Sequence, residues 1–179
     1  MCGILTYVGR ERIEDDHPAL EIIAHRGPDG RGAESFEVGE WTVNLGHRRL
    51  AILDLSDAGR QPMSFAQGRY WLVYNGEIYN YLELRGELES EGVVFQSHCD
   101  TEVLLAAYHH WGPRCLERFN GMFAFCVFDQ VDSKLFIARD RFGDTALCLA
   151  AWRGFRVLIN GLMDAGADIH ARDELGGQL

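Results

Sequence analysis

The chain has 179 residues, 47% of them apolar, so it can form one packed domain with or without a small appendage. Its formal net charge of −10 argues against nucleic-acid binding, because contacts with phosphates need clustered Lys and Arg. No apolar run of about 18 residues occurs, and the first residues lack the basic and apolar regions of a signal peptide, so we expect neither a membrane span nor secretion.

The first half of the chain is expected to form mostly strands. One helix opens at His17-Pro18, where proline suits the first turn, and residues 25–30 form a turn-rich loop. Short apolar runs bounded by turn residues predict strands at 4–8, 41–45, 49–53 and 70–74.

Two helices and a strand pair are expected next. Apolar residues at helical spacing predict helices over 79–91 and about 101–111. The continuous apolar run 122–128 predicts a strand buried on both faces, which pairs with 134–138 across a turn. Many strands, two neighbouring helices and few crossovers indicate an α+β fold, in which helices cover antiparallel sheets, up to about Gly143.

The pattern changes after Gly143. Residues 145–154 and 155–165 predict two short helices. The triplet Ala-Arg-Asp at position 138 recurs at position 171, an offset of 33 residues that is typical of helical repeat units. Two generic amphipathic helices are the alternative interpretation.

The five cysteines follow no disulfide or zinc spacing, and their number is odd, which favours a reducing cytosol and a cytoplasmic protein. We expect four of them to be ordinary core or surface thiols: Cys99, Cys115, Cys126 and Cys148.

Cys2 is different because of its position. After removal of Met1 it would carry a thiol and a free α-amino group, which titrates near about 7.7–8.0 and can accept a proton at neutral pH. One residue then supplies both nucleophile and base. Attack of its thiolate on a carboxamide gives an oxyanion, which needs hydrogen-bond donors. A cysteine at position two is not diagnostic alone, so the hypothesis depends on the motifs that accompany it.

Those motifs occur in a fixed order: Cys2-Gly3-Ile4, His25-Arg26-Gly27-Pro28-Asp29-Gly30, His47-Arg48-Arg49-Leu50, Asn75-Gly76-Glu77-Ile78-Tyr79-Asn80, Asp100-Thr101-Glu102 and Gly121-Met122-Phe123-Ala124-Phe125. With them the chain resembles the class II glutamine amidotransferases, in particular the amidotransferase half of glutamine-hydrolysing asparagine synthetases. The resemblance covers about residues 2–143.

The resemblance implies an N-terminal-nucleophile hydrolase fold, a four-layer αββα sandwich of antiparallel sheets. It implies these roles: Cys2 as nucleophile, the Asn75 amide and the Gly76 N–H as oxyanion donors, Arg49 as the site of the glutamine α-carboxylate, and Glu77 with Asp100 as the site of its ammonium.

Each residue taken alone has a plainer alternative. Arg49 could be a surface arginine on a strand, Asn75-Gly76 a type I′ hairpin turn, and Asp100 the cap of the helix that follows it. Arg26 and Asp29 are expected to shape a loop over the site rather than take part in chemistry. The sequence predicts no metal site.

Residues 140–179 resemble one ankyrin repeat and the start of a second. The first domain, 2–143, is then incomplete at its C-terminal end, because the family continues with further strands and an ATP-dependent synthetase domain. One repeat cannot bury its own apolar face, so this helical tail is expected to dock on the first domain or on a partner.

The sequence therefore predicts glutamine hydrolysis to glutamate and ammonia through a Cys2 thioester, in the context of asparagine synthesis. This step needs no cofactor; ATP and Mg would be required only with a separate synthetase domain. The implied partners are glutamine and, through the tail, a synthetase subunit or another protein. Two alternatives stay open: a catalytically inert fusion or truncated remnant whose ankyrin-like tail binds a protein, and a gene-fusion product with no selected function.

Overall fold

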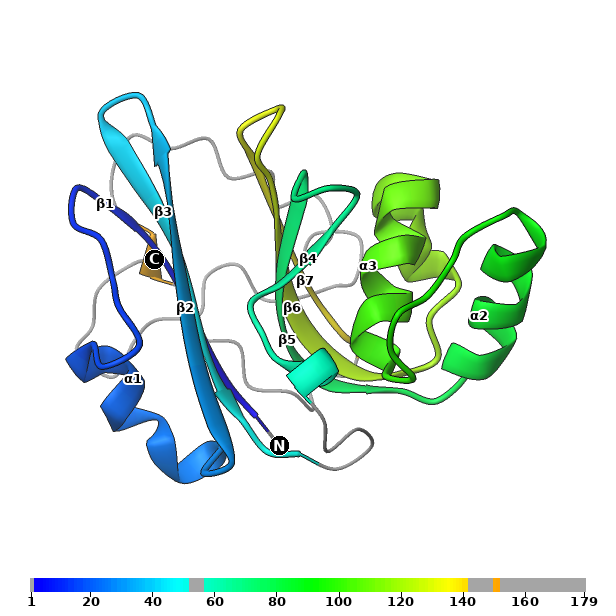
Figure 1. The fold of residues 1–179 in the computed structure, drawn as a ribbon, viewed down its shortest axis with the longest axis horizontal. Helices are drawn as coiled ribbons and strands as arrows, with labels where there is room; N and C mark the ends of the chain where they lie inside the picture. The colour runs from blue at the N-terminus through cyan, green and yellow to red at the C-terminus, as the bar shows by residue number, and fades with distance from the viewer. Residues whose placement is uncertain (1, 52–56, 142–149, 152–179) are drawn as a thin grey trace.

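The computed structural model describes residues 2–51, 57–141 and 150–151, which form two stacked four-stranded sheets with helices outside them (Figure 1). The elements in chain order are β1 (Gly3–Gly9), α1 (Pro18–Ile22), the 3₁₀ helix η1 (Ala24–Arg26), β2 (Gly30–Val38), β3 (Trp41–Arg49), η2 (Asp57–Gly59), β4 (Met63–Phe65), β5 (Tyr70–Ile78), α2 (Tyr81–Ser90), α3 (Asp100–Trp111), η3 (Gly112–Glu117), β6 (Gly121–Asp129), β7 (Lys134–Arg139) and β8 (Ala150–Ala151).

The layers follow the order helix, sheet, sheet, helix. Sheet A has the strand order β2-β3-β1-β8 and sheet B the order β4-β5-β6-β7. The pairs are antiparallel except for β1 with β8, which is parallel. In Figure 1, α1 lies beside sheet A, whereas α2 and α3 lie beside sheet B. This arrangement agrees with the predicted sandwich of antiparallel sheets between helical layers.

Sheet B is apolar on both faces. One face packs on α2 and α3 through residues such as Leu72 and Phe125, and the other packs on sheet A through residues such as Val73 and Phe128. The strand β6 is buried along most of its length, so the predicted doubly buried strand is confirmed. Burial of one large apolar side chain contributes about 1.5–3 kcal/mol to the free energy of folding. Because both faces of sheet B are covered by such side chains, this sheet forms the centre of the hydrophobic core.

The inner face of sheet A packs on sheet B through apolar side chains. Val43 and Leu45 of β3 point toward sheet B, whereas Asn44 between them lies on the outer face. The Asn44 Oδ1 accepts hydrogen bonds from the Ile13 N–H (3.1 Å) and the Ser35 hydroxyl (2.6 Å). The outer face of this sheet is therefore covered by polar contacts with the flanking segments, together with the buried side chains of Ile13 and Leu20 near Gly46.

The helix α1 covers part of that outer face and begins as its sequence predicts. Pro18 occupies the first turn, and the His17 Nδ1 accepts a hydrogen bond from the Ala19 N–H (3.3 Å). The carbonyl of Leu20 accepts a hydrogen bond from the Arg48 Nε (3.0 Å) on β3. This bond fastens the helix to the sheet.

Several strands differ from the sequence prediction. β2 and β4 were not predicted, because the glycine-rich segment of β2 shows no clear alternation and β4 has only three residues. The strand expected at 49–53 is wrong at 50–51, because β3 already ends at Arg49. β5 runs four residues beyond its predicted end, which carries Asn75 and Gly76 into the sheet.

The C-terminal prediction is mostly untested. The helix expected over 145–154 is wrong at Ala150–Ala151, which form β8; pairing with the open edge of β1 satisfies backbone groups there and overrides helical propensity. Apart from residues 140–141 and this strand, the ankyrin-like helix pair of 140–179 lies outside the described residues. Among the helices that the structure describes, none is long and apolar enough to cross a membrane.

Candidate active site

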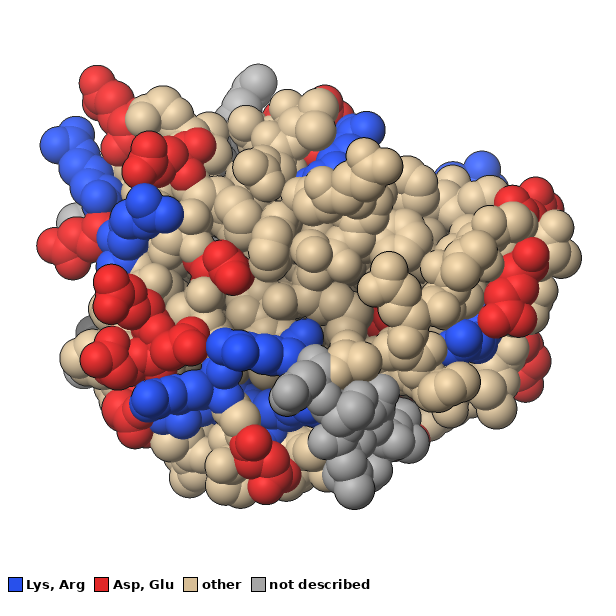
Figure 2. Space-filling model, in the orientation of Figure 1, with Lys and Arg blue, Asp and Glu red and all other residues tan. Residues whose placement is uncertain are grey.

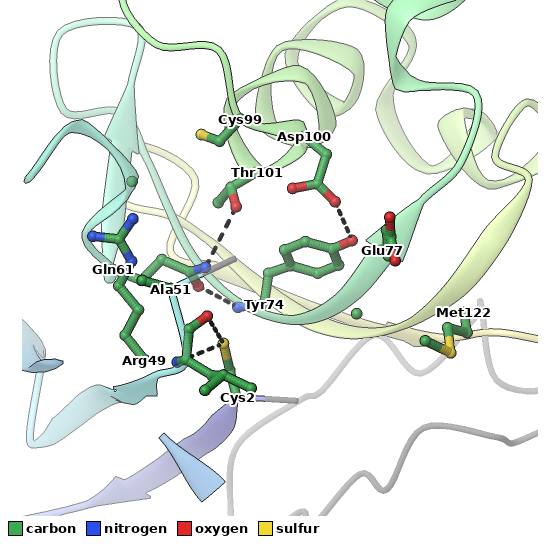
Figure 3. A pocket seen from close by; sticks show the side chains of 13 residues that line it. Cys2, Arg49, Ala51, Gln61, Tyr74, Glu77, Cys99, Asp100, Thr101 and Met122 are labelled. Carbon is green, nitrogen blue, oxygen red and sulfur yellow. Dashed lines mark hydrogen bonds between the residues drawn. The ribbon is translucent and has the colours of Figure 1, made fainter. Parts of the chain in front are cut away.

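A cavity of about 120 Å³ opens where the two sheets meet the start of α3 (Figure 3). Five of the six predicted site residues line it: Cys2, Arg49, Gly76, Glu77 and Asp100. They come from positions far apart in the chain, so the fold creates this cluster. The sixth residue, Asn75, does not line the cavity.

Cys2 lies at the sheet A side of the cavity. The Leu50 N–H donates to its Sγ (3.3 Å), and the Cys2 carbonyl accepts from the Arg26 Nε (3.1 Å). Burial raises the pKa of the Cys2 thiol above its ordinary value, against the lowering effects of the Leu50 N–H and the nearby Arg49 charge. The thiol therefore needs a base before it can act as a nucleophile.

The other described cysteines are buried. Burial raises the pKa of Cys115 and of Cys126 to about 12, as expected for unreactive core thiols. Cys99 is also buried, with its Sγ 3.0 Å from the Ser97 hydroxyl, but it lines the cavity, which the sequence did not indicate. Cys148 lies outside the described residues.

Arg49 supplies a cation to the cavity. It is the last residue of β3 and is half-buried, whereas Arg48 is 8% exposed and points to the opposite face of the strand. The Asp29 N–H donates to the Arg49 carbonyl (2.9 Å), and the Asp29 carboxylate accepts from the Ala51 N–H (2.9 Å). Asp29 therefore holds the backbone on either side of Leu50, which agrees with a structural role for this residue.

Two acids line the sheet B side of the cavity. Asp100, the first residue of α3, is 5% exposed, and its Oδ2 accepts from the Tyr74 hydroxyl (2.7 Å) and the Ile78 N–H (3.1 Å). Burial raises the pKa of Asp100, hydrogen bonds from the Tyr74 hydroxyl and from the Ile78 and Thr101 N–H groups lower it, and the charge of Glu77 raises it further. Cys99 is the N-cap residue of α3, so Asp100 is not its cap, although the Asp100 carboxylate also interacts with the Thr101 N–H at the start of the helix. A buried carboxylate beside a second acid is a good site for a cation.

Gly76 lies where β5 and β6 come unusually close. A Cβ atom at this position would lie 2.2 Å from the Met122 carbonyl oxygen, and its φ of 157° also favours glycine. Asn75 and Gly76 pair with Ala124 and Phe123 inside the β5–β6 ladder. The hairpin-turn alternative for this Asn-Gly pair is therefore wrong.

Asn75 is 1% exposed and lies on β5 two residues after Val73, which faces sheet A. Within the part of the chain that the structure describes, its Oδ1 has no hydrogen-bond partner. Alternation along β5 thus places the Asn75 side chain on the sheet A side of the strand, between two residues that line the cavity, Tyr74 and Gly76.

Sequence reasoning missed two buried residues on the cavity wall. The Gln61 Oε1 accepts from the Tyr74 N–H (2.6 Å), and its Nε2 lies 3.5 Å from the Thr101 hydroxyl. Tyr74 could have been found by counting alternation back from Asn75, which puts its side chain on the helix-covered face of β5. Gln61 has no such signal, because it precedes a three-residue strand.

A second cavity, of about 270 Å³, adjoins the first and shares Arg49 and Gln61 with it. His47 on its wall is 1% exposed, and burial lowers the pKa of this imidazole to about 3, so it is neutral. Because the Tyr74 carbonyl can only accept, the His47 Nε2 donates to it (3.2 Å). This bond ties β3 of sheet A to β5 of sheet B.

Charges of both signs mix on the surface of the molecule. In Figure 2, the basic side chains that gather at the lower left are flanked by acidic ones. Ion pairs such as Arg60–Asp15 (3.2 Å) and Arg31–Glu21 (3.6 Å) show the same mixing. The face shown therefore has no continuous basic surface. Among the described residues, no three His, Cys, Asp or Glu side chains are placed to hold a metal ion.

A family model of the glutamine amidotransferase domain matches residues 1–168, and the chain belongs to this family. It is 41% identical over 170 residues to a putative glutamine-hydrolysing asparagine synthetase of Mycobacterium tuberculosis, covering 86% of this chain and 26% of the relative. It is 46% identical over 123 residues to glutamine-hydrolysing asparagine synthetase 1 of Bacillus subtilis, covering 69% and 19%. The chain thus spans about a quarter or less of the length of these relatives.

Two solved structures share the fold. The glutamine phosphoribosylpyrophosphate amidotransferase of B. subtilis, complexed with ADP and GMP, gives a TM-score of 0.58 at 19% identity. A structure described as the allosteric regulatory enzyme of purine biosynthesis gives 0.60 at 22% identity. Each similarity covers 78% of this chain and 37% of the other. They support the N-terminal-nucleophile type of fold predicted from the sequence.

Proposed function

We propose that this chain hydrolyses glutamine to glutamate and ammonia through a thioester on Cys2. The observation that carries the proposal is the shared cavity, in which a thiol, an arginine and two acids from distant segments face one another. Family membership supports the same reaction.

The charges around the cavity suit a free amino acid. Arg49 on sheet A would bind the α-carboxylate of glutamine, for which a planar guanidinium can donate two parallel hydrogen bonds. Asp100 and Glu77, on the sheet B side, would bind the α-ammonium. A substrate held at both charged ends places its carboxamide near Cys2, and such positioning accounts for much of the rate enhancement in enzymes.

The chemistry then follows from the groups around the sulfur. The α-amino group of Cys2, once freed from Met1, takes the thiol proton, and the thiolate attacks the carboxamide carbon. The Gly76 N–H and the Asn75 amide would stabilise the tetrahedral oxyanion. Its collapse breaks the C–N bond and releases ammonia, which carries away the proton from the amine. Water then hydrolyses the thioester to glutamate and regenerates the thiol.

The names of the relatives extend the proposal beyond this domain. We place the chain in asparagine synthesis, as the glutaminase portion whose ammonia is used by an ATP- and Mg-dependent synthetase domain or subunit. The glutaminase step itself requires no cofactor. The ankyrin-like tail, as a surface for a synthetase subunit or another protein, stays a prediction.

The test is glutamate release from glutamine by the purified chain, compared with two cysteine variants. Cys2→Ala should lower the rate by roughly 10⁴-fold or more, as loss of a nucleophile does in other hydrolases. Cys99→Ala, which removes the other thiol of the cavity, should retain most of the activity.

A glutamine analogue with an electrophilic carbon at the amide position should label Cys2 covalently, so that mass spectrometry shows one bound analogue per chain. N-terminal sequencing should show that Met1 is absent. Equal rates for the wild type and Cys2→Ala would contradict the proposal. Loss of activity only in Cys99→Ala would move the nucleophile to the other thiol.

A further inference from the structure

Tyr74 lies immediately before Asn75 and faces Asp100. Its side chain is 2% exposed, and its hydroxyl donates to the Asp100 Oδ2 at 2.7 Å (Figure 3). The second donor to this oxygen is the Ile78 N–H, at 3.1 Å. Both of these bonds end on Oδ2, and Figure 3 shows the other carboxylate oxygen pointing away from the Tyr74 hydroxyl.

Tyr74 pairs with Phe125 of β6, but on the opposite edge of β5 its backbone is held by side chains. β4 pairs with β5 only as far as Leu72, so its ladder has ended two residues before Tyr74. Here the Gln61 Oε1 accepts from the Tyr74 N–H (2.6 Å), and the His47 Nε2 donates to the Tyr74 carbonyl (3.2 Å). Three segments therefore fix one residue through its N–H, its carbonyl and its hydroxyl.

We propose that Tyr74 is a positioning residue, which orients the Asp100 carboxylate toward the α-ammonium group of glutamine and so makes recognition of that group depend on a buried hydroxyl. The inference rests on the proposed function and adds to it a residue that touches the acid rather than the reacting atoms.

The electrostatics of the pair fit this role. Burial raises the pKa of Asp100, and the bond from Tyr74 opposes that effect by favouring the charged carboxylate. Burial and the adjacent Asp100 charge also raise the pKa of Tyr74 well above its ordinary value, so the hydroxyl stays a donor. A charged, oriented carboxylate is the partner that an ammonium group requires.

The test compares glutamine with glutaric acid monoamide, which is glutamine without its α-amino group. In Tyr74→Phe, kcat/KM for glutamine should fall roughly tenfold, the size expected for loss of one hydrogen bond to a charged group. The value for the monoamide should change less than about twofold. Tyr70→Phe is the matched control, because Tyr70 lies on the same face of β5 but packs on Tyr108 and His109, and both substrates should keep their wild-type values.

A double-mutant cycle with Asp100→Asn completes the design, since Tyr74→Phe should have little further effect once the carboxylate is gone. Thermal unfolding of each variant checks that it is folded. An equal loss of kcat/KM for both substrates would overturn the inference and show that Tyr74 has only a structural role. A Tyr74→Phe protein with wild-type kcat/KM for glutamine would also overturn it, because the hydroxyl would then have no effect on recognition. If the wild type itself is no faster than Cys2→Ala, the proposed function fails, which is distinguishable from either of those results.

Discussion

Sheet A and sheet B contribute opposite halves of the candidate site. Sheet A, with the segment before β1, brings Cys2 and the cation of Arg49, whereas sheet B and α3 bring Gly76 and the acids Glu77 and Asp100. A zwitterionic substrate would therefore bridge the two sheets, with its carboxylate on one and its ammonium on the other.

The two sheets are also stabilised differently. Sheet B is buried in apolar side chains on both faces, whereas the outer face of sheet A is held by hydrogen bonds such as those of Asn44 and Arg48. In sheet B the site residues share their backbone with the core, so a defect there should damage fold and catalysis together. In sheet A, one residue of β3 can face the site while its neighbour faces the outer surface of the sheet. Substitutions there should therefore affect either catalysis or stability, but not both.

Gly76→Ala on sheet B should have the largest effect. The new Cβ would lie 2.2 Å from the Met122 carbonyl oxygen, which belongs to the backbone of β6 and cannot move away cheaply. We expect kcat/KM for glutamine to fall by roughly 10³-fold or more, and the free energy of unfolding to fall by about 3 kcal/mol. Glutamate release and urea unfolding measure the two quantities.

The matched control is Gly86→Ala on α2. Gly86 is exposed, and a Cβ there meets nothing within 4 Å, so the change should stabilise the chain by about 0.5–1 kcal/mol and leave activity unchanged. Normal activity and stability in Gly76→Ala would show that the two strands are not as closely packed as described.

Arg49 and Arg48 test the separation expected for sheet A. Arg49→Ala should raise KM for glutamine by roughly 10–100-fold, through loss of charged hydrogen bonds to the α-carboxylate. Arg48→Ala removes the bonds to the Leu20 carbonyl and to Glu21 on the outer face. It should lower the free energy of unfolding by about 1–3 kcal/mol with KM within about twofold of wild type.

Steady-state kinetics and urea unfolding of both arginine variants provide the readout. The reverse result, with KM raised by Arg48→Ala and not by Arg49→Ala, would contradict the proposed site, because it would place the substrate carboxylate on the outer face of β3.

The elements best predicted from sequence are those whose pattern is repeated over many residues. The helices at 81–90 and 100–111 and the buried strand at 121–129 carry strong helical or apolar patterns, and the structure agrees with them. β2 escaped prediction because Gly30-Arg-Gly-Ala-Glu has weak strand propensity, and only its nine-residue pairing with β3 makes it a strand. At Asn75-Gly76, pairing with β6 likewise overrides the local turn preference.

The candidate site divides in the same way. Its chemically distinctive residues, such as Cys2 and Asp100, could be identified from motif order, and the structure brings them to one cavity. Gln61 could not, and for Tyr74 alternation along β5 gives only the face of the strand, because the partners of both residues are brought within 2.7 Å by tertiary folding. Residues that support a site through others leave little trace in a single sequence.

His47 gives the most specific test, because its bond to the Tyr74 carbonyl joins the two sheets. Burial lowers the pKa of His47 to about 3, below the ordinary value of 6.5 expected in the unfolded chain. Its contribution to stability is therefore fully present above about pH 6.5 and is lost as pH falls toward 3, by up to about 1.4 kcal/mol per pH unit. His47→Gln cannot take up this proton.

Urea unfolding of the wild type and His47→Gln between pH 8 and pH 4 should show this difference. At pH 8 the variant should have a lower free energy of unfolding than the wild type, because it loses packing and weakens the bond between the sheets. Protonation of His47 makes no contribution at this pH. As pH falls below about 6.5, the wild type should lose stability faster, so the gap narrows, while carboxylates that protonate in both proteins cancel in the comparison. Parallel curves would mean that His47 is not held neutral between the sheets, and that their connection at the site depends on other contacts.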